Sequence, residues 1–336
     1  MQGIGDIGIV PAQTVSEDQI LYWQYYLRQG YQAGMGYLER NIDKRADPKT
    51  LLPGANSLIV AIIPYHPPAG TATNPHIALY AQGKDYHKVV KDKLFLLASL
   101  LPPSPFRAFC DTAPLLEKYW AWRAGLGYIG RNTLLIHPRF GSFCFIGIML
   151  TRHRFDQYDQ ALPDSGGETA KTSAPPASID TSIGERENGK EETGAKKAIL
   201  SSHPCTDCNR CLQSCPGLAL GTGLDARRCF SYLTIEHKGE RPAIQSPYWF
   251  GCDICQTVCP ANSRWIPFSE NIPEDSIDPR LLPLPATTSL TPSGIADMPQ
   301  TRFDALFKES ALQRAGLEGL KKNVQAWEKA HRKSIL

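Results

Sequence analysis

The sequence predicts an α/β (α+β) layered domain joined to a small cysteine-rich domain. Three observations lead to this fold class. Through residues 1–155, apolar β-branched runs alternate with segments whose apolar residues recur every three or four positions. A polar, low-complexity stretch follows at 156–199. Beyond it, eight of the ten cysteines fall between Cys205 and Cys259.

The layered domain is expected to begin with a helix and to alternate helices with strands. Helix boundaries are expected at Ser, Asp or Thr on the N-terminal side and at Gly or Pro on the C-terminal side. Strands are expected where short, β-branched apolar runs lie between turn residues. The expected elements are a helix from Ser16 to Gly30, a strand at 56–65, a helix at 85–101, a strand at 106–110, a helix from Pro114 to about Ala124 with Thr112 as its cap, and strands at 133–138 and 143–150.

The remainder of the chain divides where its composition changes. Residues 156–199 are rich in Gly, Ser, Thr, Pro, Glu and Lys, and no aromatic residue occurs between Tyr158 and Phe230. Such a segment cannot bury enough apolar area to offset the entropy lost on ordering, so we expect a disordered insertion. The predicted organisation is a layered domain at 1–155, the insertion at 156–199, a compact cysteine-rich domain at 200–266, and a Pro-rich linker with a helical tail at 267–336.

The bulk composition argues against a membrane-spanning or secreted protein. The chain has 336 residues, of which 42% are hydrophobic, and this is enough to build a core. No run of about 18 apolar residues occurs, and the N-terminus lacks the basic and then apolar pattern of a secretory signal. The net charge of +3 neither indicates nor excludes a nucleic-acid partner. We therefore expect a cytoplasmic protein.

The first cysteine run has the spacing of a bacterial ferredoxin. Cys205, Cys208, Cys211 and Cys215 follow the pattern C-x2-C-x2-C-x3-C, and Pro216 comes directly after the last of them. In this pattern three thiolates face one [4Fe–4S] cubane and the fourth ligates a second cubane. A structural zinc site is the alternative, but zinc motifs usually supply two pairs of ligands. The spacing therefore favours a ferredoxin-like domain.

The second run, from Cys252 to Pro260, lacks one member of the full pattern. Two cubanes need eight thiolates, and the two runs supply seven. Cys229 lies between the runs and is the natural eighth ligand. By the ferredoxin crossing rule, one cluster is expected to take Cys205, Cys208, Cys211 and Cys259, and the other Cys215, Cys229, Cys252 and Cys255.

Two motifs in the layered domain have both a structural and a functional interpretation. Residues 125–130 fit G-x-G-x-x-G, but here a helix precedes the motif and a strand follows it, which reverses the order of a dinucleotide fingerprint. A helix end with a glycine-rich turn is therefore favoured. Asp111 follows a strand, and it is either a site carboxylate at a sheet edge or the cap of the next helix.

Four isolated residues and one loop carry weaker signals. His87 and His137 have no ligand pattern around them, so each is expected to be structural or at the surface. Cys110 and Cys144 lie in apolar runs and are expected to be small buried hydrophobic residues. The loop at 237–241 is basic, and it is either a solvated turn or a phosphate contact.

Several stretches of the chain together resemble the epoxyqueuosine reductase family, in an order that covers nearly the whole chain outside the insertion. Their combination is far more specific than the cysteine runs alone. They are RADP from Arg45, LLPGANSLIV, KDYHKV, FCDTAPLLEK, AGLGYIGRNTLLI, CTDCNRCLQSCP, RRCFSYLTIEHKGE and FGCDICQTVCPAN.

The resemblance implies reduction of epoxyqueuosine to queuosine at the wobble position of tRNA, with electrons passing through two [4Fe–4S] clusters to a base-off cobalamin. It implies that Asp111, in the D-[ST]-x-P pattern, donates a proton, for which it must hold a proton near neutral pH. It also implies a monomer that receives electrons from a low-potential donor such as ferredoxin or flavodoxin. The corrin-contacting stretches of the family match Arg45, Tyr86, Asp111, Gly130, Arg131, Asn132, Ser231 and Asp253, and we expect His237, Lys238 and Arg241 to contact tRNA phosphates.

Three departures from the family pattern accompany the resemblance. Arg131 stands where the family often has Lys, the insertion at 156–199 replaces a short connection, and the sequence ends without the helical extension of longer members. Two other functions remain open at this point. One is a reductive dehalogenase-like enzyme, against which the missing export signal and the YLTIEHKG loop speak. The other is a ferredoxin-type electron carrier without catalysis, which would leave residues 1–155 without a role.

Overall fold

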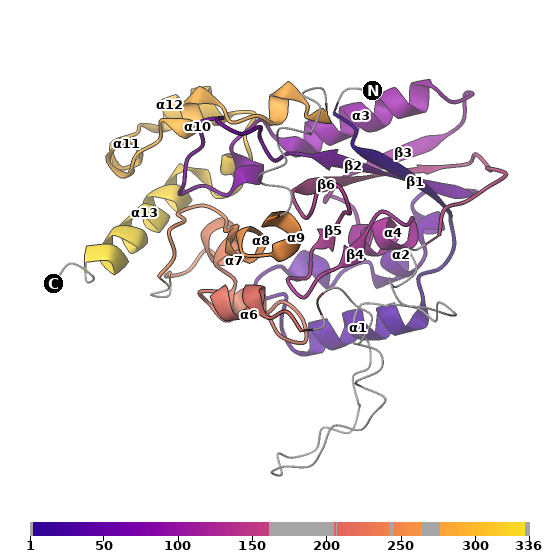
Figure 1. Ribbon diagram of the computed structural model, residues 1–336, viewed down its shortest axis with the longest axis horizontal. Coiled ribbons are helices and arrows are strands. Elements are labelled where there is room, and N and C mark those ends of the chain that lie inside the picture. The colour runs from indigo at the N-terminus through magenta and orange to yellow at the C-terminus, as the bar shows by residue number, and fades with distance from the viewer. Residues whose placement is uncertain (1–2, 161–204, 206, 242–244, 264–275, 333–336) are drawn as a thin grey trace, which may run out of the picture.

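A computed structural model of the chain describes residues 3–160, 205, 207–241, 245–263 and 276–332 (Figure 1). Most of the insertion expected at 156–199 lies outside the described residues. Its first residues, however, are placed against the sheet. The backbone N–H of Asp159 donates to the carbonyl of Ile9 at 2.8 Å, and the Asp159 carboxylate accepts from the Ile9 N–H at 2.7 Å. The chain therefore covers a strand edge as far as this residue.

A four-stranded sheet with the order β1-β2-β6-β3 forms the centre of the layered domain. All neighbouring strands in it are antiparallel. The predicted strands at 56–65, 106–110 and 143–150 are confirmed, whereas the N-terminal edge strand was not predicted. The strands are β1 (Asp6–Pro11), β2 (Ser57–Pro64), β3 (Phe106–Phe109) and β6 (Cys144–Thr151).

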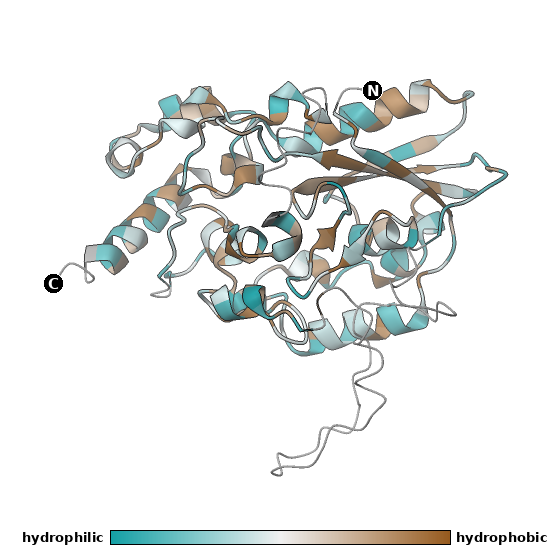
Figure 2. Cartoon of the chain, viewed as in Figure 1, coloured by the Kyte–Doolittle hydropathy of each residue, from teal (hydrophilic) through white to brown (hydrophobic). Residues whose placement is uncertain are grey.

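Helices cover both faces of this sheet, with α3 (Tyr86–Ser99) on one face and α4 (Glu117–Arg123) on the other (Figure 1). Alternate residues of β2 enter two separate cores. Leu58, Val60 and Ile62 pack with Trp120 of α4, and Ile59, Ala61 and Ile63 pack with Val90 and Leu94 of α3. Because both faces are covered, the whole strand is apolar, as the brown ribbons of Figure 2 show. The layered α/β architecture is thus confirmed.

The expected helix at 114–124 begins later than its sequence suggests. α4 starts at Glu117, and its preceding residue, Leu116, makes no side-chain cap. Thr112 is not a helix cap, because its backbone N–H donates to the carbonyl of Cys110 at 2.6 Å and closes a tight turn. The residues from Cys110 to Pro114 are therefore used to reverse the chain between strand and helix.

The predicted strand at 133–138 forms a strand of two residues, followed by an isolated bridge between His137 and Gly141. β5 (Leu135–Ile136) pairs with β4 (Tyr128–Ile129) in a ribbon separate from the main sheet. The expected interpretation of residues 125–130 is confirmed, since α4 ends just before them and Gly125 and Gly127 have φ of +71° and +148°. This order of helix, glycine turn and hairpin differs from that of a dinucleotide-binding turn.

The cysteine-containing segment packs directly against the layered domain. The backbone N–H of Ala226 donates to Tyr31 at 2.9 Å, that of Trp249 to His76 at 2.8 Å, and that of Ala78 to Phe250 at 2.9 Å. The predicted helix α1 (Glu17–Arg28) and the short helix α2 (Ile42–Ala46) lie below α4 in Figure 1. The short helices of the cysteine-containing segment are α6 (Arg210–Ser214), α7 (Phe230–Ile235), α8 (Ile254–Thr257) and α9 (Pro260–Ser263).

The residues expected to form a linker and helical tail build a third core. Trp249 and Phe250, which precede the second cysteine run, are fully buried there with Phe303, Phe307 and Leu320. The last cysteine run therefore depends on the C-terminal helices for its position. These are α10 (Pro285–Thr288), α11 (Pro292–Ala296), α12 (Gln300–Phe307) and α13 (Gly316–Arg332).

Short 3-10 turns join many of these elements. They are Gly36–Leu38, Pro48–Thr50, Leu79–Ala81, Ala226–Arg228, Pro279–Leu281 and Ala311–Arg314. Among the residues described here, no helix has the length and apolar character needed to cross a membrane.

Replacing Gly127 by Ala is expected to lower the free energy of unfolding by about 1–3 kcal/mol. An added Cβ would lie 2.3 Å from the carbonyl oxygen of Ile136, and the φ of +148° is strained for any L side chain. Gly36→Ala is the matched control, since nothing lies within 4 Å of its added Cβ. Urea denaturation of the two variants measures the difference, and equal stabilities would contradict the geometry.

Candidate active site and cysteine centre

The eight clustered cysteines form two neighbouring groups in space. Burial raises the pKa of the Cys211 thiol to about 11, and the charges of nearby thiols raise it further. Those thiols are Cys205, Cys259 and Cys208. The described structure therefore brings Cys259, from the second run, to the first three cysteines of the first run.

The second group lies beside the first. Burial raises the pKa of Cys252 to about 12, with smaller contributions from Cys229 and Cys215. The pKa of the Cys255 thiol is also raised well above its usual range, first by burial and then by the charges of Cys252 and Cys229. Cys211 of the first group contributes to the same shift. Thiols from both cysteine runs thus influence one another's pKa, which places the two runs near each other.

Backbone N–H groups point at several of these sulfur atoms. The N–H of Ala219 donates to Cys215 Sγ at 3.3 Å. Burial raises the pKa of Cys205, and a hydrogen bond from the backbone of Arg131 opposes that shift. Hydrogen bonds of this kind favour the thiolate form and tune the potential of an iron–sulfur cluster.

A single-ion site receives no support from the geometry. Among the described residues, no three His, Cys, Asp or Glu side chains are grouped so that they could hold one metal ion.

Two predicted site residues connect the β4–β5 turn to the cysteine loops. The side chain of Asn132, which is buried, donates to the carbonyl of Cys255 at 3.3 Å and accepts from the N–H of Leu134 at 3.2 Å. The guanidinium of Arg131 donates to the carbonyl of Cys208 at 3.4 Å and to the side chain of Asn209. Both side chains therefore hold cysteine loops in place in this structure.

Asp253 and the nearby residues anchor the second cysteine run. The Asp253 carboxylate is only 2% exposed, and it accepts from the N–H of Leu79 at 2.7 Å and from the Gln256 amide at 3.1 Å. Burial raises its pKa to about 6, and both hydrogen bonds oppose the shift. Ser231 lies in α7, two residues after Cys229, and donates a backbone hydrogen bond to that thiol.

Asp111 lies in the tight turn after β3, in a left-handed backbone conformation with φ of +55°. The hydroxyl of Tyr86 donates to Asp111 Oδ2 at 2.6 Å. The Tyr86 ring stacks on Phe145 with ring centroids 4.1 Å apart, which fixes the hydroxyl. Asp111 is not the cap of the next helix, because α4 begins at Glu117 and Leu116 precedes it. The carboxylate is placed by the turn and by Tyr86 instead.

The family resemblance indicated Tyr86 as a corrin contact, and no sequence argument gave a role to Glu117. The backbone N–H of Asp111 donates to Glu117 Oε1 at 2.7 Å. The pKa of Glu117 is raised well above its usual range. Burial is the largest cause, and the side chain of Asp111 raises the pKa further. A Glu at the start of a helix is too common to be a signal in the sequence.

Three buried polar groups without a partner among the described residues come from α1 and α2. They are Nε of Arg45, Nε1 of Trp23 and Oε1 of Gln19. The Arg45 guanidinium lies 5.0 Å from the centroid of the Trp23 ring, and Gln19 is one helical turn before Trp23. Buried polar groups are usually paired in proteins, so this cluster is suited to a polar ligand. The sequence indicated only Arg45 of the three.

The other isolated residues have structural contacts. His87 Nδ1 lies 2.7 Å from Asp85 Oδ1, and the buried His137 bonds Asp6 at 3.0 Å through Nε2. Cys110 is buried and Cys144 partly so, each within an apolar core. These four residues therefore fit the structural roles expected of them.

The basic loop at 237–241 is partly tied to the protein itself. The Arg241 guanidinium donates to Asn323 Oδ1 at 2.6 Å and to the carbonyl of His237 at 2.5 Å. Lys238 is exposed, and His237 Nε2 lies 3.0 Å from the carbonyl of Glu240. Of the three predicted contacts, Lys238 is thus the side chain that faces solvent.

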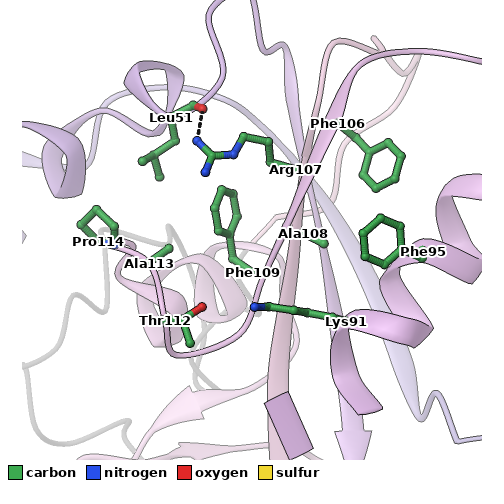
Figure 3. A pocket seen from close by; sticks show the side chains of 10 residues that line it. All are labelled: Leu51, Lys91, Phe95, Phe106, Arg107, Ala108, Phe109, Thr112, Ala113 and Pro114. Carbon is green, nitrogen blue, oxygen red and sulfur yellow. Dashed lines mark hydrogen bonds between the residues drawn. The ribbon is translucent and has the colours of Figure 1, made fainter. Parts of the chain in front are cut away.

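A groove of about 310 Å³ lies behind the Asp111 turn, between α3 and β3 (Figure 3). Figure 3 shows Lys91 pointing toward Thr112, and Arg107 bonded to the carbonyl of Leu51. Thr112, Ala113 and Pro114 form one wall. The outer side of the turn that carries Asp111 therefore borders open space.

The comparisons with known proteins agree with this arrangement. Residues 45–112 match a family model described as epoxyqueuosine reductase QueG, and residues 204–262 match a 4Fe–4S double cluster binding domain. Fold and site thus define an iron–sulfur oxidoreductase of mixed α/β architecture.

An epoxyqueuosine reductase from Leadbetterella byssophila is 32% identical over 327 residues, which cover 94% of this chain and 91% of that protein. This chain belongs to the epoxyqueuosine reductase family. An epoxyqueuosine reductase solved with an epoxyqueuosine-modified tRNA stem loop has the same fold, with a TM-score of 0.75, 24% identity and coverage of 99% of this chain and 79% of that one. The Bacillus subtilis enzyme, solved with its catalytic aspartate loop swung out of the active site, has a TM-score of 0.74, 23% identity and the same coverage.

Proposed function

We propose that this protein reduces epoxyqueuosine to queuosine at the wobble position of tRNA, with Asp111 as the proton donor. The observation that carries the proposal is the position of Asp111. Its carboxylate is held at 2.6 Å by the Tyr86 hydroxyl, in a family member whose chain also contains a double cluster domain. A related enzyme is described with a catalytic aspartate on a mobile loop, and Asp111 lies on the turn after β3.

Two [4Fe–4S] clusters are assigned to the eight thiols. The neighbours of Cys211 and Cys252 support the crossed arrangement, because each group contains thiols from both cysteine runs. Cubanes bound by four thiolates transfer electrons singly at low potential. A low-potential donor such as ferredoxin or flavodoxin would supply those electrons. The assignment is Cys205, Cys208, Cys211 and Cys259 for one cluster, and Cys215, Cys229, Cys252 and Cys255 for the other.

A base-off cobalamin is assigned to the layered domain beside the cysteine loops. The unpartnered groups of Arg45, Trp23 and Gln19 fit the amide and phosphate groups of such a cofactor, which offer both donors and acceptors. When bound, cobalamin supplies low-valent cobalt chemistry that a side chain cannot perform. The remaining predicted corrin contacts are Tyr86, Asp111, Gly130, Arg131, Asn132, Ser231 and Asp253.

The side chains around Asp111 then perform the proton chemistry. Removing the epoxide oxygen as water takes two electrons and two protons. Asp111 delivers a proton to the departing oxygen, and Tyr86 keeps the carboxyl group oriented by donating to Oδ2. The Tyr86 hydroxyl remains protonated throughout, since burial and then the charge of Asp111 raise its pKa.

The tRNA substrate is assigned to the side of the protein that carries the 237–241 loop. A structural relative was crystallised with a modified tRNA stem loop, and single-stranded loops allow a base to be splayed into a pocket. Lys238 is exposed and free to approach phosphates, whereas Arg241 stabilises the loop through Asn323. His237 is expected to contact the phosphate backbone of the tRNA stem loop.

Anaerobic reconstitution is expected to give about eight irons per chain, four for each cubane. Cys229→Ser is expected to reduce this to about four, because it removes a ligand from one cluster only. Cys144→Ala is the control and should keep all the iron, since this thiol lies in an apolar core and donates to the carbonyl of Gly141. Iron and zinc analysis decides the result, and zinc at the thiols would contradict the assignment.

Asp111→Asn is expected to lower the turnover of epoxyqueuosine in a tRNA stem loop by at least about 10²-fold, because the amide cannot deliver a proton. Cluster content and binding of cobalamin and RNA should stay unchanged, since Asn still accepts from Tyr86. Mass spectrometry of the nucleosides after anaerobic incubation with reductant and cobalamin measures the activity.

The matched control for that experiment is Asp297→Asn, an exposed carboxylate at the end of α11. It should behave as the unaltered protein. Full activity of Asp111→Asn would overturn the role of Asp111, and a lack of any dependence on added cobalamin would overturn the cofactor assignment.

Binding of the stem loop is expected to weaken steeply with added salt, because phosphate contacts release counterions. Lys238→Ala should reduce the slope of log K against log salt by about one. Lys49→Ala, an exposed lysine outside the loop, serves as the control. Fluorescence anisotropy at several salt concentrations gives the slopes, and an unchanged slope in Lys238→Ala would remove this residue from the RNA surface.

A further inference from the structure

The turn that carries Asp111 has a second acidic side chain built against it. The backbone N–H of Asp111 donates to Glu117 Oε1 at 2.7 Å, and the side chain of Asp111 is among the groups that raise the pKa of Glu117. Glu117 is the first residue of α4, whose buried face packs on the sheet through Trp120. The position of Glu117 is therefore fixed by a rigid element, while the Asp111 turn is not.

The turn itself has little other support. Asp111 is exposed and has a φ of +55°, in the left-handed region that residues other than glycine rarely adopt. Its outer side borders the groove lined by Thr112, Ala113 and Pro114 (Figure 3). The side-chain contacts that the described residues make with Asp111 come from Tyr86 and Glu117. One of them orients the carboxylate, and the other holds its backbone.

We propose that Glu117 is the positioning partner of Asp111 and also supplies, through Asp111, one of the two protons that the reaction consumes. This proposal rests on the proposed function. In the reaction the two C–O bonds of the epoxide break, two electrons enter from the reduced enzyme, a C=C bond forms and the oxygen leaves as water. One carboxyl group can deliver only one of the two protons directly. A second carboxyl group, which the backbone N–H of Asp111 holds beside it at 2.7 Å, restores the proton of Asp111.

The surroundings of Glu117 favour its protonated form at rest. Burial raises its pKa first, and the negative charge of Asp111 adds to that effect, whereas Lys118 opposes it. The amine of Lys118 is turned away toward the carbonyl of Thr133, to which it donates at 2.6 Å. Because the protonated acid is the active form, the reaction rate should fall as the pH rises through the pKa of Glu117. The titratable and charged groups that face Glu117 are Asp111, Lys118, Arg45 and Cys110.

The test compares Glu117→Gln and Glu117→Ala with the unaltered protein in single-turnover reduction of a modified stem loop, over a range of pH. Gln can still accept from the Asp111 N–H, so it preserves the turn but carries no acidic proton. We expect Glu117→Gln to lower the rate constant by about 10²-fold and to shift the fall of the rate at alkaline pH, because Asp111 then remains as the titrating acid. Iron content and affinity for the stem loop should stay unchanged, and Glu318→Gln, an exposed residue of α13, should have no effect.

Two outcomes overturn the proposal. If Glu117→Gln keeps the normal rate while Glu117→Ala is slow, Glu117 only holds the turn. If Glu117→Gln is slow but retains the normal pH profile, the titrating group is another one.

An infrared difference spectrum separates this proposal from the proposed function, because it needs no substrate. The resting protein should show a protonated-carboxyl band at neutral pH that shifts in D₂O and is missing from Glu117→Gln. A protein that lacks epoxyqueuosine reduction but shows this band would refute the function and leave Glu117 as a protonated partner of Asp111. A protein that reduces the substrate without the band would refute the role of Glu117 alone.

Discussion

The cysteine centre depends on one packing constraint, namely the burial of Trp249 and Phe250 between the layered domain and the C-terminal helices. These two side chains are fully buried, and the backbone at Phe250 pairs with Ala78 of the layered domain. Cys252 follows two residues after Phe250, so its position is set by that core. Cysteines from separate runs can share a cluster only when their loops are held side by side, because thiolate ligation tolerates little change in distance.

The same principle operates at the acidic site. Tyr86 is fixed by α3 and by stacking on Phe145, and Glu117 is fixed by α4. These helices lie on opposite faces of the sheet, and both side chains reach the turn after β3. A flexible turn thus acquires a defined carboxylate position from two rigid elements. Such support allows an exposed acid to be oriented for proton transfer without being buried itself.

Much of the fold could be predicted because its signals are local. The apolar run of β2 and the helical periodicity of α3 needed only their own residues, and both elements appear where expected. β1 was missed because Gly8 and its short length weaken the strand pattern, and its pairing with β2 supplies the stability that its sequence lacks. Thr112 was misassigned because a residue that can cap a helix can equally close a turn. Thr112 closes a turn because α4 begins only at Glu117, and no local sequence pattern determines that starting position.

The sequence by itself determined the chemistry that is available: eight clustered cysteines with ferredoxin spacing, and an aspartate in a motif that resembles one family. These features are covalent and short-range, so residue spacing records them directly. Only the tertiary structure decided which thiols are neighbours, that Tyr86 bonds Asp111, and that Glu117 supports the same turn. It also gathered the unpaired groups of Gln19, Trp23 and Arg45 in one place. Contacts of this kind arise when distant segments pack against a shared core, and spacing along the chain carries no record of them.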